Sequence, residues 1–200
     1  MKQELDMSIT SRLPALDDAT ASPEQRRVLD AILGGPRGNL DGPFLAWIHS
    51  PALADHAQRL GAFCRYGTRL ELRLTELAIL FTASWWQSQA EWQIHEPIAR
   101  EAGVSASLIE ALREGLTEDQ EPDCERDDEA LVVRLGRSLY TTRRVSEALY
   151  AEAVEAFGEP AVVELVGVFG YYALVAMTLN VFEVRRDDGP LPFPEPPTPG

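Results

Sequence analysis

The apolar residues of this 200-residue chain recur every three to four positions, and this spacing constrains its fold more than any other feature. The segment "LELRLTELAILFTASWW", residues 70–86, places an apolar side chain in each turn on one helix face: Leu70, Leu74, Leu77 and Phe81. Strict alternation of apolar and polar residues, which would indicate half-buried strands, is absent from the sequence. The pattern therefore predicts an all-α protein.

Capping residues divide this pattern into separate helices. Ser22 followed by Pro23 is typical of a helix start, and we expect that helix to end near residue 33. The glycine- and proline-rich "GGPRGNLDGP", residues 34–43, follows it and has none of the patterns of a phosphate-binding loop. We expect a surface loop there.

Three later segments complete the secondary-structure prediction. A helix that starts at Ser50-Pro51 is expected to bury one face made of Leu53, Ala57, Leu60 and Cys64. The acidic segment 116–130 lacks the residue order of a calcium loop and is expected to be a solvated link. The most apolar segment, from Glu159 to Val184, predicts a long helix.

The chain is expected to form one helical domain over residues 1–186, followed by an extended proline-rich tail over residues 187–200. The segments that begin at Glu76 and Glu164 share an opening Glu-Leu, an aromatic pair and a closing Glu. This similarity is compatible with an internal repeat of a helical hairpin, and equally with chance resemblance between two apolar helices.

Composition narrows the class of protein. A net charge of −14 disfavours nucleic-acid binding, which needs clustered cations. No uninterrupted apolar run approaches 18 residues, and the polar start "MKQELDMSIT" lacks the core of a signal peptide, so we expect neither a membrane span nor export. A cytoplasmic protein is expected. Cys64 and Cys124 are far apart and fit reduced thiols better than a disulfide or a zinc site.

The stretch "SWWQSQAEWQIHEP", residues 84–97, holds the candidate chemistry. Helical spacing places Ser88, Glu91 and His95 on one face. On one straight helix Glu76 would lie about 28 Å from His95, at a rise of about 1.5 Å per residue. "TASWWQS" is poor in strong helix formers, and a chain reversal there would bring these two side chains together.

These residues resemble a known superfamily. Glu76, Ser88, Glu91 and His95 stand at the spacing E-x11-C-x2-C-x3-H of the carboxymuconolactone decarboxylase and alkyl hydroperoxidase D superfamily, and "AEWQIHEPIAREAGVS" is similar to its decarboxylase-like branch. The resemblance covers about residues 44–112 and implies an alkyl hydroperoxidase D-like helical bundle that forms homotrimers or homohexamers. Ser88 and Glu91 replace the two redox cysteines, so thiol peroxidase activity is not expected.

The resemblance to the decarboxylase branch implies a cofactor-independent lyase. Its substrate would be a small unsaturated or lactone-type carboxylic acid, whose conjugated carbonyl accepts the electrons left by CO2. His95 would act as general acid, oriented by Glu76 or Glu91. We expect no cofactor, no metal and no macromolecular partner other than further copies of the chain.

Several neighbouring residues have two readings each. Trp85, Trp86 and Trp92 would either wall a substrate pocket or pack in the core or a subunit interface. The Ser88 hydroxyl would bind substrate or cap the second helix.

Arginines and histidines near the motif are further candidates for the site. Arg65, Arg69 and Arg73 are four residues apart and would share a helix face, with Arg73 assigned to the substrate carboxylate. His49 and His56 make no metal site by themselves, although an approach of His49 to His95 and the glutamates would reopen that possibility.

Two other functions fit the same residues. One is an isomerase or cyclase that uses the acid–base pair without losing CO2. The other is a non-catalytic, oligomeric small-molecule-binding protein in which the pocket serves recognition only.

Overall fold

The computed structural model describes residues 9–16, 20–116, 123–186 and 189–195, and within these the fold is helical, as predicted. Two two-residue strands, β1 (Ile9–Thr10) and β2 (Arg185–Arg186), pair antiparallel. The helices are α1 (Pro23–Leu33), α2 (Phe44–Trp47), α3 (Pro51–Tyr66), α4 (Leu72–Trp85), α5 (Gln89–Glu101), α6 (Ala106–Glu114), α7 (Asp127–Thr142), α8 (Glu147–Phe157) and α9 (Glu159–Val181).

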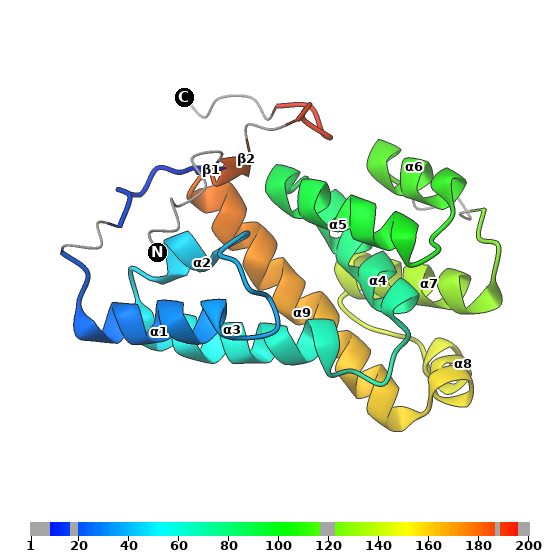
Figure 1. Ribbon diagram of the computed structural model, residues 1–200. Coiled ribbons are helices and arrows are strands. Elements are labelled where there is room, and N and C mark those ends of the chain that lie inside the picture. Colours follow the sequence, from blue (N-terminus) through cyan, green and yellow to red (C-terminus); the bar gives the residue numbers. More distant parts are fainter. Residues whose placement is uncertain (1–8, 17–19, 117–122, 187–188, 196–200) are drawn as a thin grey trace.

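The core forms around α4 and α9. Figure 1 shows α9, in orange, crossing the molecule, with α1–α3 on one side of it and α4–α8 on the other. Helix α4 packs against α5, α7 and α9, and every residue from Arg73 to Ala83 is buried. Polar side chains on a helix that is enclosed on three sides are shielded from water. Burial of the Glu76 carboxyl on α4 is therefore unfavourable unless it has a polar partner.

The chain reversal predicted from "TASWWQS" is confirmed. Helix α4 ends at Trp85, and α5 begins after Ser88. Between them Gln87 takes a left-handed backbone conformation, with φ +47°, and the Ser88 N–H donates to the Ala83 carbonyl at 2.9 Å. The two helices then pack against each other as a hairpin.

Serine hydroxyls cap the starts of α1 and α8, and the cap at Ser22 confirms the helix start predicted there. At α1 the Ser22 hydroxyl accepts from the Gln25 N–H, and the Gln25 side chain accepts from the Ser22 N–H, which completes a capping box. At α8 the Ser146 hydroxyl accepts from the Leu149 N–H. Helix α9 ends at Val181, three residues earlier than expected.

The buried face predicted for α3 was partly wrong. Leu53 and Leu60 are 45% and 49% exposed, whereas the small residues Ala54, Ala57 and Gly61 face the core with Cys64. Small side chains allow α3 to lie close to α9: a Cβ at position 61 would clash with the Tyr171 hydroxyl. Close packing against α9 requires small side chains, so these, and not the larger leucines, form the inner face of α3.

The two segments that share sequence features fold differently. Residues 76–96 form the α4–α5 hairpin, whereas the segment that starts at Glu164 continues through the single helix α9. By length and composition α9 could cross a membrane, but 61% of its most apolar window is buried inside the molecule. That burial is the pattern of a core helix in a globular protein.

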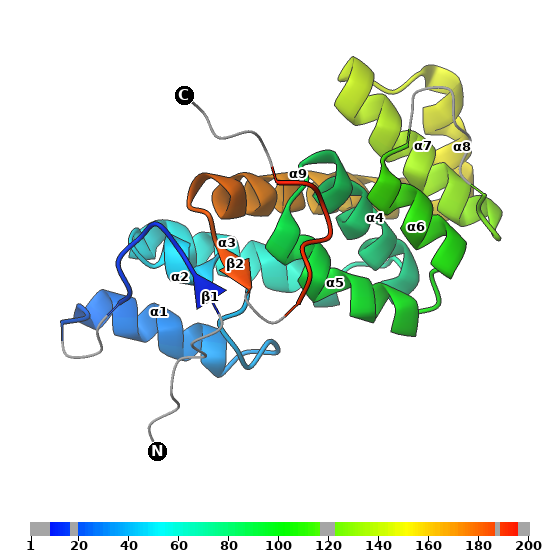
Figure 2. The same ribbon diagram turned by 90° about the horizontal axis from the view of Figure 1, so that it is seen from above.

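The described part of the proline-rich tail is extended and lies against the chain's own helix α5. The Gln89 side chain pairs with the backbone of Phe193, donating to its carbonyl at 2.8 Å and accepting from its N–H at 2.9 Å. The Phe193 ring packs edge-to-face on Trp92, with 5.2 Å between centroids. Figure 2 shows this segment, in red, crossing α5.

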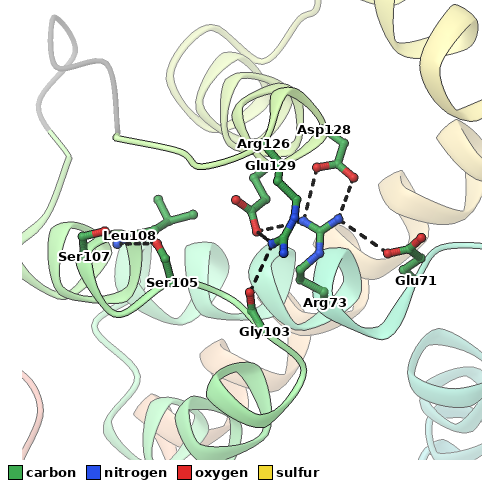
Figure 3. Close-up of polar contacts among 9 residues, drawn as sticks. All are labelled: Glu71, Arg73, Gly103, Ser105, Ser107, Leu108, Arg126, Asp128 and Glu129. Atoms are coloured by element: carbon green, nitrogen blue, oxygen red, sulfur yellow. Dashed lines mark hydrogen bonds and ion pairs between the residues drawn. The ribbon is translucent and has the colours of Figure 1, made fainter.

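A cluster of charges joins the starts of α4 and α7. The Arg73 guanidinium donates to Glu129 at 2.8 Å and to Asp128 at 2.6 Å, and Arg126 donates to Glu129 at 3.2 Å and to the Gly103 carbonyl at 3.3 Å (Figure 3). Glu129 is fully buried, so the two arginines supply the positive charge that its burial requires.

Replacement of Gly136 by alanine is expected to destabilise the fold. A Cβ there would lie 2.8 Å from the Phe81 ring and 3.0 Å from the Phe169 ring. Overpacking costs about 1–3 kcal/mol and the helix propensity of alanine recovers about 1 kcal/mol, so the free energy of unfolding should fall by up to about 2 kcal/mol. Urea unfolding measures this change.

Gly170→Ala is the matched control. Gly170 lies inside α9, and no heavy atom within 4 Å would meet a Cβ there. That variant should gain up to about 1 kcal/mol, because only the propensity changes. Equal shifts of both variants in the same direction would contradict close packing at Gly136.

Candidate functional site

The hairpin brings Glu76 on α4 and His95 on α5 into direct contact. His95 Nδ1 lies 2.7 Å from Glu76 Oε2, although 19 residues separate them in the sequence. Glu76 is fully buried and His95 is 5% exposed. The pair is therefore held in a nearly dry environment, where a hydrogen bond of this kind is stronger than in water.

This contact determines which nitrogen of His95 is available for chemistry. A carboxylate at Glu76 accepts the hydrogen of Nδ1–H, which leaves Nε2 to accept or donate a proton elsewhere. The imidazole is fixed further by Tyr172, whose ring meets it edge-to-face at 5.2 Å. An oriented imidazole with one free nitrogen is the usual arrangement of a general acid–base.

Glu91 lies one helical turn before His95 and is 1% exposed. Neither of its carboxyl oxygens has a hydrogen-bond partner among the described residues. Burial raises the pKa of Glu91 well above its ordinary value, because the charged form would lose its hydration without gaining a partner. Burial therefore favours the protonated form of Glu91, which can donate a hydrogen bond.

Ser88 occupies the N-cap position of α5, but its hydroxyl makes no capping bond. It is fully buried, and within the described chain its oxygen has no partner, as is also true of Glu76 Oε1. Buried polar atoms are nearly always paired in folded proteins. Ser88 and Glu76 therefore hold unpaired polar atoms inside the hairpin, and neither residue lines the cavity described next.

A cavity of about 300 Å³ adjoins this hairpin. Glu91 and His95 line it from α5, and Tyr171 and Tyr172 line it from α9. Apolar walls are added by Phe44, Ile94, Ile98, Val175 and Leu179. The volume is at the lower end of the range of about 300–1,000 Å³ for small-molecule sites, so it suits a small ligand.

Sequence reasoning missed the other wall of this cavity. The loop 34–43, expected only at the surface, contributes Arg37, Asn39, Asp41, Gly42 and Pro43. Arg186 joins it from β2, which pairs with β1 near the N-terminus of the chain. Nothing in the local sequence signals this role, since the loop acts by its position and carries no motif.

The three arginines spaced four apart do not share a helix face. Arg65 is on α3 and lines the cavity, Arg69 lies in the connection to α4 and pairs with Glu164, and Arg73 begins α4. Arg73 is not among the cavity residues; its guanidinium is bound in the charge cluster of Figure 3. The helix that was expected to align the three arginines is interrupted between residues 65 and 73, so Arg65, and not Arg73, faces the cavity.

The three tryptophans also lie outside the cavity lining. Trp85 is exposed and stacks on Tyr140 at 5.5 Å, and Trp86 is half-buried at the hairpin turn. Trp92 is fully buried, donates to Glu96 at 2.9 Å and packs under the tail. Trp85 and Trp92 therefore pack against other side chains and do not wall the cavity.

His49 and His56 are exposed and do not line the cavity. Across the described ranges, no group of three or more His, Cys, Asp or Glu is placed to hold a metal ion.

The two cysteines are also outside the cavity lining. Burial raises the pKa of the Cys64 thiol to about 11, so it is protonated at neutral pH, and Cys124 is partly exposed. A protonated thiol is a poor nucleophile toward peroxides.

Comparison with known proteins shows which solved structures share this fold. No protein-family model matches the sequence, and no curated protein does either. Among solved structures, the chain is similar to an alkylhydroperoxidase AhpD core protein, an uncharacterized peroxidase-related protein from Ralstonia eutropha JMP134. The identity is 15%, the TM-score is 0.71, and the alignment covers 89% of this chain and 93% of the other.

Two further structures agree. An uncharacterized peroxidase-related protein from Silicibacter sp. TM1040 has 12% identity and a TM-score of 0.63, covering 88% of this chain and 93% of its own. A cysteine-to-alanine variant of the debrominase Bmp8, in complex with 2,3,4-tribromopyrrole, has 14% identity and a TM-score of 0.58, covering 87% and 90%. The chain therefore has the AhpD-like helical fold that the family resemblance implied.

Proposed function

We propose that the protein is a cofactor-independent lyase of the decarboxylase type, acting on a small unsaturated or lactone-type carboxylic acid. The observation that carries this proposal is the buried Glu76–His95 pair, which adjoins the buried Glu91 at a cavity. These groups transfer or share protons, and the thiol needed for peroxidase chemistry is replaced by Ser88 and Glu91 at the motif positions.

Each side chain has a role in such a reaction. When the C–C bond to the carboxylate breaks, CO2 leaves and the electron pair passes through the double bond to the conjugated carbonyl, giving an enolate. The Glu91 carboxyl donates a hydrogen bond to that oxygen. Protonated His95 then delivers a proton from Nε2 to the carbon, and the Glu76 carboxylate stabilises the imidazolium before and during transfer.

Two further observations support a small organic substrate. The cavity combines ionisable groups with aromatic and aliphatic walls, as small-molecule sites do. The debrominase Bmp8 variant, which has a similar fold, is in complex with 2,3,4-tribromopyrrole, and this supports a ligand of that size here.

Replacement of His95 by asparagine is expected to lower kcat by about 10²–10⁴, the usual contribution of a positioned general acid. Glu76→Gln keeps the shape but removes the charge, and should cost at least about tenfold. The measurement is CO2 release from a panel of lactone acids and unsaturated acids. His56→Asn, at an exposed position outside the cavity, is the control.

The products decide between the alternatives. Unchanged turnover in both variants would remove the pair from the mechanism. A product that keeps every carbon atom would indicate an isomerase or cyclase. Binding without turnover over the whole panel would indicate a recognition protein.

Glu91→Gln is expected to stabilise the protein increasingly as the pH rises. Because the folded state holds this proton more tightly than the unfolded state, whose glutamate titrates near 4.5, folding becomes less favourable as pH rises from about 4.5 toward the folded pKa. Each unit of that difference corresponds to about 1.4 kcal/mol. Glutamine does not titrate and avoids the loss.

The test compares thermal unfolding midpoints of the variant and the parent protein from pH 5 to pH 8. The difference should grow with pH. Glu101→Gln, at an exposed position of the same helix, should give a difference that does not depend on pH. Parallel curves for the two variants would show that Glu91 is ionised in the folded protein.

We also propose that the chain self-associates through the outer face of α3. Leu53, Leu60, Phe63 and Tyr66 are all exposed there, within one helix. Contiguous exposed apolar surface commonly marks an interface, and the resemblance to the superfamily implies trimers or hexamers.

Phe63→Glu should therefore lower the native mass to that of a smaller assembly or a monomer, since it places a charge in the contact. Native mass spectrometry or light scattering measures this. Val163→Glu, at an exposed position of α9 outside this face, should keep the parental mass. A monomeric parent protein would refute the proposal.

A further inference from the structure

The cavity beside His95 is positively charged, although the whole chain carries a net charge of −14. Its lining holds three arginines, Arg37, Arg65 and Arg186, and two acidic residues, Asp41 and Glu91, and burial of Glu91 favours its uncharged form. The arginines thus outnumber the acidic residues at this cavity, in contrast to the chain as a whole. An anionic ligand would be attracted into this cavity in spite of the overall charge.

Two of these arginines lack a counter-charge. Arg186 lies 3.4 Å from Asp41 and forms an ion pair with it. Across the part of the chain that the structure describes, no carboxylate lies within 4.0 Å of the Arg37 or Arg65 guanidinium. This contrasts with Arg59 on the same helix as Arg65, which pairs with Asp55.

The protein fixes both guanidinium groups by contacts that leave their charge unbalanced. Arg37 donates to the Gln58 carbonyl at 3.3 Å and lies over the Phe44 ring at 4.8 Å. Arg65 lies over the Tyr66 ring at 5.3 Å. A guanidinium that is held by aromatic rings and a carbonyl keeps N–H groups free for a ligand.

The backbone of α3 makes room for this arrangement. A Cβ at position 61 would collide with Arg37 Nη2 and with the Tyr171 hydroxyl, so glycine is the residue that lets both side chains reach the cavity. Arg37 and Arg65 come from different elements, the loop 34–43 and α3, and both face the space that His95 and Glu91 line from α5.

We infer that Arg37 and Arg65 bind the anionic group of the substrate, a carboxylate carried on a small apolar body. Resting on the function proposed above, this inference assigns one end of the cavity to binding and the end at His95 and Glu91 to proton transfer. Arginine forks bind carboxylates and phosphates equally well in geometry. The apolar walls at Tyr172, Val175 and Leu179 favour an organic anion over inorganic phosphate.

The test measures binding and does not depend on turnover. The probe is sorbate, a planar unsaturated monocarboxylate, compared with its neutral amide by isothermal titration calorimetry. The parent protein should bind sorbate and should bind the amide at least about tenfold more weakly. Arg37→Gln and Arg65→Gln should each weaken sorbate binding by about tenfold or more, as expected when a charged hydrogen bond is lost.

Matched variants separate local from general effects. Arg59→Gln removes the same charge from α3 outside the cavity and should leave sorbate binding unchanged. Arg65→Lys keeps the charge without the fork, so it should bind with intermediate affinity. If circular dichroism shows that Arg65→Gln does not fold, the sorbate affinity of Arg65→Lys still tests the role of Arg65.

The outcomes distinguish this inference from the proposed function. His95→Asn should weaken sorbate binding less than Arg37→Gln or Arg65→Gln does, because the arginines carry most of the affinity. Arginine-dependent binding without turnover of any substrate would support the binding site and reject the lyase. Equal binding of sorbate and its amide, no binding of sorbate by the parent protein, unchanged binding in both glutamine variants, or displacement of sorbate by equimolar phosphate would each overturn the inference.

Discussion

The buried contact between Glu76 and His95 is the interaction on which the site depends. A carboxyl group inside α4, enclosed by α5, α7 and α9, is unfavourable unless it has a polar partner. The structure supplies one at 2.7 Å from the next helix. The hairpin that joins the two helices is therefore as important for the chemistry as for the packing, since it converts a 19-residue separation into a hydrogen bond.

Charge is distributed unevenly over the molecule, and this matters more than its total. Buried Glu129 is matched by Arg73 and Arg126, so that cluster is locally compensated and structural. Glu91 has no such compensation, and its burial favours the uncharged form. An arginine reaches Glu129 but not Glu91, and this separates a residue that joins helices from one that faces the cavity.

The sequence predicted what depends on local patterns. Helical periodicity, serine caps and the weak helix formers of "TASWWQS" led to the helical fold and to the meeting of Glu76 with His95. What it missed depends on contacts distant in the chain. The loop 34–43 gains its role by lying opposite α5, and Arg73 loses its assigned role because α7, over 50 residues later, supplies its partners. Helix periodicity does not predict that the loop lies near α5 or that α7 lies near Arg73.

The docking of the tail on α5 bears on the order in which the molecule can be completed. The partner of Gln89 at Phe193 is 104 residues further along the chain, so the outer side of the helix that carries His95 is covered by one of the last described segments. During synthesis, α4 and α5 can pair as soon as they emerge, but Trp92 lacks its contact with Phe193 until residue 193 has also emerged. This helix can therefore reach its final packing only after a segment 104 residues beyond Gln89 has been made.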